Sequence, residues 1–122
     1  MRVEKLSLVE ENAAVQLKGE CSILDIYITV WQASAIEEGM RGVTQPRPST
    51  HDIIVDILED FGIQPMMVKI TKMEEGTYYA ELYLTSWNRL LILDIRPSDA
   101  IAVAVRTNTP IYVNENLVTK TC

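Results

Sequence analysis

The stretch RPSDAIAVAVR, residues 96–106, decides the fold class that this sequence predicts. Its second half alternates Ala with Ile or Val, and such alternation is typical of a strand. It is also small and apolar on every side, which is typical of a buried helix. The opening Pro97-Ser98-Asp99 favours the helix, because Pro is tolerated in a first helical turn and Ser and Asp accept hydrogen bonds from its free amides. We therefore predict a helix from Ser98 to Arg106.

The tripeptide Arg-Pro-Ser also occurs at residues 47–49, again directly before a stretch that predicts a helix. Exposed amides at a helix N-terminus attract anions, and an Arg beside them suits a phosphate. The simpler interpretation is that Pro and Ser only start helices, and that the repeat reflects duplicated architecture. We favour the simpler interpretation for the Pro and Ser residues and a functional one for Arg47 and Arg96.

Strand and helix signals fill the rest of the chain. Alternation and β-branched residues predict strands at 3–9, 13–17, 21–30, 66–73, 77–85, 90–95 and 110–113. A capping box at Ser34 and Glu37 predicts a helix that ends at Gly42, and Asn114 begins a short turn or helix. A further helix is capped by Ser49 or Thr50, is stopped by Gly62 and packs through Ile53, Ile54, Ile57, Leu58 and Phe61. These elements predict an α+β fold with mixed or antiparallel β-sheets and three to four short helices.

The two halves of the chain match in two short stretches. ILDI occurs at residues 23–26 and again at 92–95, and the segment from Ala35 to Arg41 matches that from Ala100 to Arg106. If the match is real, two related β-β-β-α units pack around one core. Chance is the alternative, because the spacing between the matches differs and short coincidences are common in hydrophobic strands.

Size and composition indicate a single domain, residues 1–122. The chain is 48% hydrophobic, which suits one core without disulfide support. It has no apolar run of about 20 residues and no signal-peptide pattern at its charged N-terminus, so we expect a cytoplasmic protein with no membrane contact. Cys21 and Cys122 are expected to be free thiols, because a frayed C-terminus seldom holds disulfide geometry.

The net charge of −6 restricts the way in which this protein binds nucleic acid. Proteins that bind by neutralising phosphates usually carry a basic stripe. Any polyanion is therefore expected to bind weakly, through metal ions or through local contacts with Arg41, Arg47, Arg96 and Arg106. Stacking aromatics are few, and the common phosphate-loop, dinucleotide, zinc-protease and nucleophile-elbow motifs are absent.

His51 is the only histidine and falls in the first turn of a predicted helix. The positive end of the helix dipole disfavours a second positive charge, so we expect a neutral imidazole that can accept a proton or bind a metal. A His that only caps the helix is the alternative. Asp52 and Asp99 occupy matching first-turn positions and, with Asp94 and Glu37, supply oxygen ligands for a magnesium or manganese ion if the helix starts converge. Stabilisation of the helix dipole alone also explains these carboxylates.

Two motifs resemble those of the bifunctional nuclease (BFN) domain family. The first is RPSTHD at residues 47–52, and the second is DIRPSDAIAVAVRT at residues 94–107, followed by PIYV at 110–113. The resemblance covers about residues 20–118 and includes ASAI at 33–36. Separated motifs in the same order are much harder to obtain by chance than either alone. The resemblance implies a compact α+β domain, cleavage of both DNA and RNA, and self-association into a homo-oligomer.

Carried over residue by residue, the resemblance points to one set of positions. They are Arg47, Thr50, His51 and Asp52 in the first motif, and Asp94, Arg96, Ser98, Asp99 and Arg106 in the second. Gln32 departs from the pattern, because family members often have a glutamate just before the ASAI segment. If that carboxylate is a metal ligand, this chain is expected to be a weaker or inactive nuclease.

Cleavage of DNA as well as RNA implies that water attacks the phosphorus, because DNA has no 2′-hydroxyl nucleophile. That requirement favours a divalent metal, magnesium or manganese. The hypothesis assigns Asp52, Asp99 and Asp94 to the metal, His51 to proton acceptance, and Arg47 and Arg96 to the phosphate charge.

Two other classes of function remain open. One is a non-catalytic binding or regulatory module that recognises a phosphorylated ligand or a protein partner, which the acidic charge and scarce aromatics favour. The other is a structural oligomer subunit in which Arg47 and Arg96 form interface ion pairs.

Overall fold

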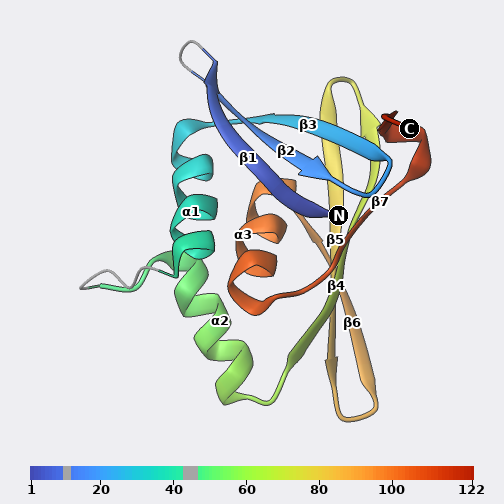
Figure 1. Cartoon of the computed structure of the whole chain (residues 1–122). Coiled ribbons are helices and arrows are strands. Elements are labelled where there is room, and N and C mark those ends of the chain that lie inside the picture. Colours follow the sequence, from blue (N-terminus) through green and yellow to red (C-terminus); the bar gives the residue numbers. More distant parts are fainter. Residues whose placement is uncertain (10–11, 43–46) are drawn as a thin grey trace.

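Two four-stranded sheets and three α-helices make up residues 1–9, 12–42 and 47–122, the part of the chain described by this computed structural model (Figure 1). The strands are β1 (Arg2–Val9), β2 (Asn12–Lys18), β3 (Ser22–Ile28), β4 (Gln64–Glu74), β5 (Thr77–Ser86), β6 (Arg89–Ile95), β7 (Ile111–Val113) and β8 (Thr119–Lys120). The helices are α1 (Val30–Arg41), α2 (Thr50–Asp60) and α3 (Pro97–Thr107), with a 3₁₀ turn, η1, at Glu115–Leu117. No helix of the described residues is both long and apolar enough to cross a bilayer.

The two sheets confirm the predicted α+β class. The first has the order β1-β2-β3-β8 and is antiparallel throughout. The second has the order β6-β5-β4-β7, in which β4, β5 and β6 form the predicted antiparallel meander and β7 adds a parallel edge to β4. In each half, three antiparallel strands precede a helix, β1-β2-β3-α1 and β4-β5-β6-α3, which is the element order predicted for related units.

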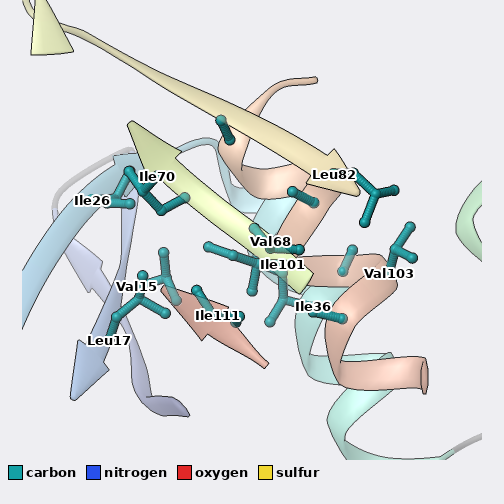
Figure 2. Packing of buried hydrophobic residues seen from close by; sticks show 14 of the residues in the cluster. Val15, Leu17, Ile26, Ile36, Val68, Ile70, Leu82, Ile101, Val103 and Ile111 are labelled. Atoms are coloured by element: carbon teal, nitrogen blue, oxygen red, sulfur yellow. The ribbon is translucent and has the colours of Figure 1, made fainter. Parts of the chain in front are cut away.

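Helix α3 lies at the centre of the fold. In Figure 1 it stands between α1 and the strands β4 and β5, and it contacts all three as well as α2. Residues 100–104 are buried, because Ala alternates with Ile and Val and leaves room for neighbours on every side. Figure 2 shows Ile101 and Val103 among buried side chains from both sheets and from α1. The ambiguous stretch is therefore a helix, as its Pro-Ser-Asp opening predicts.

Helix α1 begins earlier than the sequence predicted. Its N-cap is Thr29, whose hydroxyl accepts from the Gln32 amide while the Gln32 side chain accepts from the Thr29 amide at 2.9 Å. The capping box predicted at Ser34 and Glu37 is thus wrong. Pairing of β3 with β2 continues only to Ile28, so the chain is free to turn at Thr29.

Helix α2 buries a narrower face than the sequence predicted. Val55 and Leu58 are buried, whereas Ile53, Ile57 and Phe61 of the predicted apolar face are exposed. Helix α2 packs against α3. Ile57 and Phe61 line a cavity of about 510 Å³ together with residues of β6.

A disulfide between Cys21 and Cys122 overturns the prediction of free thiols. Strand β8 pairs with β3, and the Thr121 amide donates to the Cys21 carbonyl oxygen at 3.0 Å, so the C-terminus is held in place. The two Cα atoms lie 5.0 Å apart, within the usual disulfide range. The cytoplasmic location remains a prediction, and structural disulfides are unusual in that compartment.

Because this disulfide links residues separated by 101 positions, it should restrict the unfolded chain strongly. When the parent protein is unfolded in the absence of reductant, thiol titration should detect no free thiol. Cys122→Ser should lower the free energy of unfolding by about 2–5 kcal/mol, whereas Thr121→Ala should change it little. Thiol titration and urea unfolding measure these outcomes, and two titratable thiols in the unfolded, unreduced parent would contradict the assignment.

Candidate functional site

The first turns of α2 and α3 meet through one contact between side chains. His51 Nε2 lies 2.9 Å from Asp99 Oδ1, and both side chains are largely buried. The two residues are far apart in sequence, so the contact requires α2 and α3 to pack side by side. The expected convergence of the two helix starts is therefore present in the fold.

Asp99 also accepts hydrogen bonds from Arg96. Arg96 Nε lies 2.6 Å from Oδ2 and Nη2 lies 3.2 Å from Oδ1, which makes the pair bidentate. Burial raises the pKa of Asp99, but the hydrogen bonds from Arg96 and His51 outweigh it, and its pKa lies below the ordinary value. The same pair raises the pKa of Arg96. Asp99 is thus a carboxylate at neutral pH.

The ionised carboxylate fixes the proton of the imidazole. A carboxylate only accepts hydrogen bonds, so Nε2 of His51 must carry the hydrogen of the His51–Asp99 bond. Nδ1 makes no hydrogen bond within residues 1–9, 12–42 and 47–122. A neutral ring held in this way has its unprotonated nitrogen available to accept a proton, which is the arrangement that a general base requires.

Asp52 forms an ion pair that links α2 to α3. Arg106 Nε donates to Asp52 Oδ1 at 2.7 Å, and the Arg106 side chain is only 7% exposed. The hydrogen bond from Arg106 is the main cause that lowers the pKa of Asp52, with smaller contributions from Ser49. Gly39 of α1 provides the space, because a Cβ at this position would lie 2.6 Å from Arg106 Nη1.

Asp52 also caps its own helix. Its Oδ2 accepts from the Ser49 amide at 3.0 Å, and the Ser49 hydroxyl accepts from the Asp52 amide, which completes a capping box. Both carboxylate oxygens of Asp52 therefore have structural partners. This arrangement favours the stabilising interpretation of Asp52 over its expected role as a metal ligand.

The remaining predicted site residues do not join the His51–Asp99 contact. Asp94 is exposed on β6, and Thr50 and Arg47 are exposed at the start of α2. Glu37 pairs with Arg41 on the surface of α1. Ser98 is buried and makes no side-chain hydrogen bond within the described residues. No group of three or more His, Cys, Asp or Glu side chains in the described part of the chain is arranged to hold a metal ion.

Gln32 has a structural role that explains its presence in this chain. Its side chain completes the capping box of α1, and a capping box accepts Glu or Gln equally at this position. The departure from the family pattern therefore preserves the helix cap. A glutamate at this position would carry out the same capping function.

The partnership of Asp52 with Arg106 was not found by sequence reasoning, which treated Arg106 as a polyanion contact. The available signal was the placement of Arg106 in the last turn of a helix that is otherwise apolar on all sides. A charged residue in such a buried helix needs an internal partner. The positions of the two helices in space were required to identify that partner as Asp52.

Comparison with known proteins supports the motif-based resemblance. The family model described as Bifunctional nuclease domain matches residues 15–122. Bifunctional nuclease 1 of Oryza sativa subsp. indica is 30% identical over 122 residues, covering 95% of this chain and 37% of the relative. Bifunctional nuclease 2 of Arabidopsis thaliana is 31% identical over 112 residues, covering 87% and 34%.

A bacterial relative is more similar in sequence. An uncharacterized protein of Mycobacterium tuberculosis is 40% identical over 95 residues, which covers 75% of this chain and 56% of that protein. The chain therefore spans between about a third and just over half of the length of these relatives.

The Asp52–Arg106 pair should make stability depend on pH. Because its pKa is lowered in the folded state, Asp52 adds stability above its ordinary pKa of 3.8 and loses it as pH falls through the folded value. Asp52→Asn should lower the free energy of unfolding by about 3 kcal/mol at pH 7, and the difference from the parent should shrink as pH falls below 3.8 and through the lowered folded-state pKa. Urea unfolding at several pH values measures this. Asp56→Asn, one turn later and exposed, is the control, and an equal effect of both substitutions would contradict the assignment.

Proposed function

Because the chain belongs to the bifunctional nuclease domain family, we propose that it hydrolyses phosphodiester bonds of DNA and RNA at the start of α2 and α3. The observation that carries the proposal is the contact of His51 with Asp99, which is itself held by Arg96. The contact combines a proton acceptor, a carboxylate that orients it and a guanidinium suited to phosphate. The names of the plant relatives support the nuclease class.

The proposed step uses these groups in defined roles. Nδ1 of His51 takes a proton from water as the water oxygen forms a bond to phosphorus and the bond to the leaving oxygen breaks. Asp99 holds the ring through Nε2 and stabilises the imidazolium that forms. The imidazolium then gives this proton to the departing oxygen, which returns His51 to its neutral form.

Two arginines neutralise the phosphate charge in this proposal. Arg96 uses Nε and Nη2 for Asp99 and keeps further N–H donors for a substrate oxygen. Arg47 is exposed just before the Ser49 cap and has no ion pair within the described residues, so its guanidinium is available for a neighbouring phosphate. With a net charge of −6, binding of nucleic acid should be weak, local and sensitive to salt.

The described residues offer few ligands for magnesium or manganese near His51. His51 and Asp99 offer donor atoms of suitable type, but Asp52 is occupied by Arg106 and Asp94 is exposed on β6. The donor set in the described residues therefore does not fit a metal ion held by protein ligands alone. The proposed proton transfer needs only His51 and its carboxylate.

A binding module that recognises a phosphorylated ligand is the second candidate. The acidic net charge and the lack of a three-residue metal cluster in the described part of the chain favour it. In that case the helix starts would bind phosphate without turnover. Measurements of turnover separate the two candidates.

The nuclease proposal predicts that His51→Ala lowers the rate of cleavage of single-stranded DNA and RNA by about 100-fold or more, because the proton acceptor is lost. Asp60→Asn, exposed at the end of the same helix, should cleave at the parent rate. A fluorescent oligonucleotide assay measures both variants, each purified in the same way. Full activity in His51→Ala would exclude this site, and an inactive parent would favour the binding module.

The same assay, repeated in the presence of a chelator, tests whether cleavage requires a metal ion. If the parent loses activity in chelator and regains it with magnesium or manganese, the metal-assisted hypothesis is supported. Unchanged activity in chelator would remove the metal from the proposal without affecting the role of His51.

Self-association, which the family resemblance implies, is proposed to use β6. This strand is the edge of its sheet, and residues 90–93 are apolar and between 38% and 57% exposed, on both faces. An antiparallel edge strand is self-complementary, because a two-fold axis perpendicular to the sheet pairs it with its own copy. Such pairing also covers an edge that is prone to unspecific association. We therefore take a second copy of this chain as the occupant.

Size-exclusion chromatography with light scattering tests this interface. The parent should behave as a dimer or larger assembly at about 50 µM, a concentration at which low-micromolar interfaces are occupied. Leu91→Lys should convert it to a monomer, because charge on an edge strand opposes pairing. Lys5→Ala, exposed on β1, is the control, and a monomeric parent would contradict the interface.

A further inference from the structure

Helix α3 starts without a side-chain cap. The N-cap residue is Arg96, and it makes no capping hydrogen bond, whereas α1 and α2 each begin with a complete capping box. No hydrogen bond from the amides of Ser98 or Asp99 is found within residues 1–9, 12–42 and 47–122. These amides form the positive end of an eleven-residue helix and are available to an external acceptor.

Ser98 supplies a second and independent observation at the same place. Its side chain is 3% exposed, and its hydroxyl is the single buried side-chain oxygen or nitrogen in the described residues without a hydrogen-bond partner. A buried hydroxyl without a hydrogen-bond partner is unfavourable, so a partner for it is expected. Neither packing nor helix capping in the described chain supplies one.

A cavity of about 270 Å³ adjoins this helix start. Ser98 and Arg96 line it from α3, Tyr27 and Gln32 from β3 and α1, and Thr77 and Tyr78 from β5. Its volume lies just below the usual range of ligand pockets and suits a small fragment, such as one phosphate with its nucleoside. The lining combines a guanidinium, hydroxyl groups and aromatic rings, which are the groups that bind phosphate and stack on bases.

We propose that this cavity is a phosphate subsite that holds one nucleotide of the substrate beside the scissile bond. The phosphate accepts hydrogen bonds from the Ser98 hydroxyl and from the amides at the start of α3, and Arg96 contributes charge from the rim. This inference rests on the proposed nuclease function only for its choice of nucleic acid as the ligand. It names a position for a phosphate that does not react.

The carboxylate of Asp99 does not oppose an anion at this position. Arg96 neutralises it through a bidentate pair, and His51 donates to the same group. The base is placed by Tyr27, whose side chain is 70% exposed and stands at the wall of the cavity. Base stacking on an exposed aromatic ring tolerates any base, as a nuclease of broad sequence range requires.

Backbone NMR of the intact chain with inorganic phosphate and adenosine monophosphate tests the subsite. Neither probe contains a phosphodiester bond, so binding is measured without turnover. Both probes should shift the amide signals of Ser98 and Asp99 in a saturable manner. The amides of Asp52 and Ser49 at α2 are an internal control, because the capping box already satisfies them. Adenosine monophosphate should bind about five-fold or more tightly than phosphate, because of stacking.

Variants separate the phosphate contact from the stacking contact. Ser98→Ala should weaken binding of both probes about ten-fold, because a hydrogen bond to a charged group is lost. Without a ligand, its melting temperature should equal or exceed that of the parent, because an unpaired hydroxyl is removed. Tyr27→Ala should abolish only the preference for adenosine monophosphate over phosphate. Ser34→Ala, exposed on α1, should behave as the parent.

Three results would overturn the subsite: no shift at Ser98 and Asp99 with either probe, equal shifts at α2, or unchanged binding in Ser98→Ala. If the partner of the Ser98 hydroxyl is an ordered water and not a phosphate, neither probe should shift the Ser98 and Asp99 signals. Each result is distinguishable from failure of the nuclease proposal, because that failure appears as an inactive parent in the oligonucleotide assay. An inactive parent that binds both probes would leave the subsite intact and favour the binding module.

Discussion

The burial of α3 on every side is the constraint on which the rest of the structure depends. Its alternation of Ala with Ile and Val allows α1, α2 and the strands β4 and β5 to approach it closely. A helix in this position cannot leave charged groups without partners, so Arg106 at its last turn must pair internally. Asp52 satisfies that requirement, and the neighbouring His51 is thereby brought to Asp99 at the first turn. The site is thus a consequence of packing α2 against α3.

The two carboxylates that link α2 to α3, Asp52 and Asp99, make different contacts. Asp52 has both carboxylate oxygens engaged by Ser49 and Arg106 and serves the fold. Asp99 lies in a matching first-turn position, yet it orients His51 and binds Arg96 instead of capping its helix. The two Arg-Pro-Ser motifs therefore begin helices with different local chemistry. This difference leaves the start of α3 open to a ligand, while the start of α2 is closed.

Local signals in the sequence were sufficient for most of the fold. The helix from Ser98, the meander of β4 to β6 and the Ser49 cap follow from residues that are neighbours in the chain. The start of α1 was missed because Thr29 with Gln32 and Ser34 with Glu37 both satisfy the capping pattern, and only the end of β3 pairing distinguishes them.

Long-range contacts explain the other differences from the sequence predictions. The disulfide depends on β8 pairing with β3 across nearly the whole chain, and neither cysteine carries a local signal of it. The sequence identified His51, Asp99 and Arg96 as candidates, but it did not separate them from Asp52 and Asp94. That separation requires the position of Arg106, which lies 54 residues away in sequence from its partner.

The tautomer of His51 tests the central claim most directly. The chain contains a single histidine, so its ring nitrogens are assigned without ambiguity in a long-range ¹H–¹⁵N NMR spectrum. At a pH where the ring is neutral, the parent should carry the proton on Nε2 with Nδ1 unprotonated, and Asp99→Ala should shift the ring toward a mixture of tautomers. A proton on Nδ1 in the parent, or a spectrum that does not change in Asp99→Ala, would show that the starts of α2 and α3 do not form the proposed site.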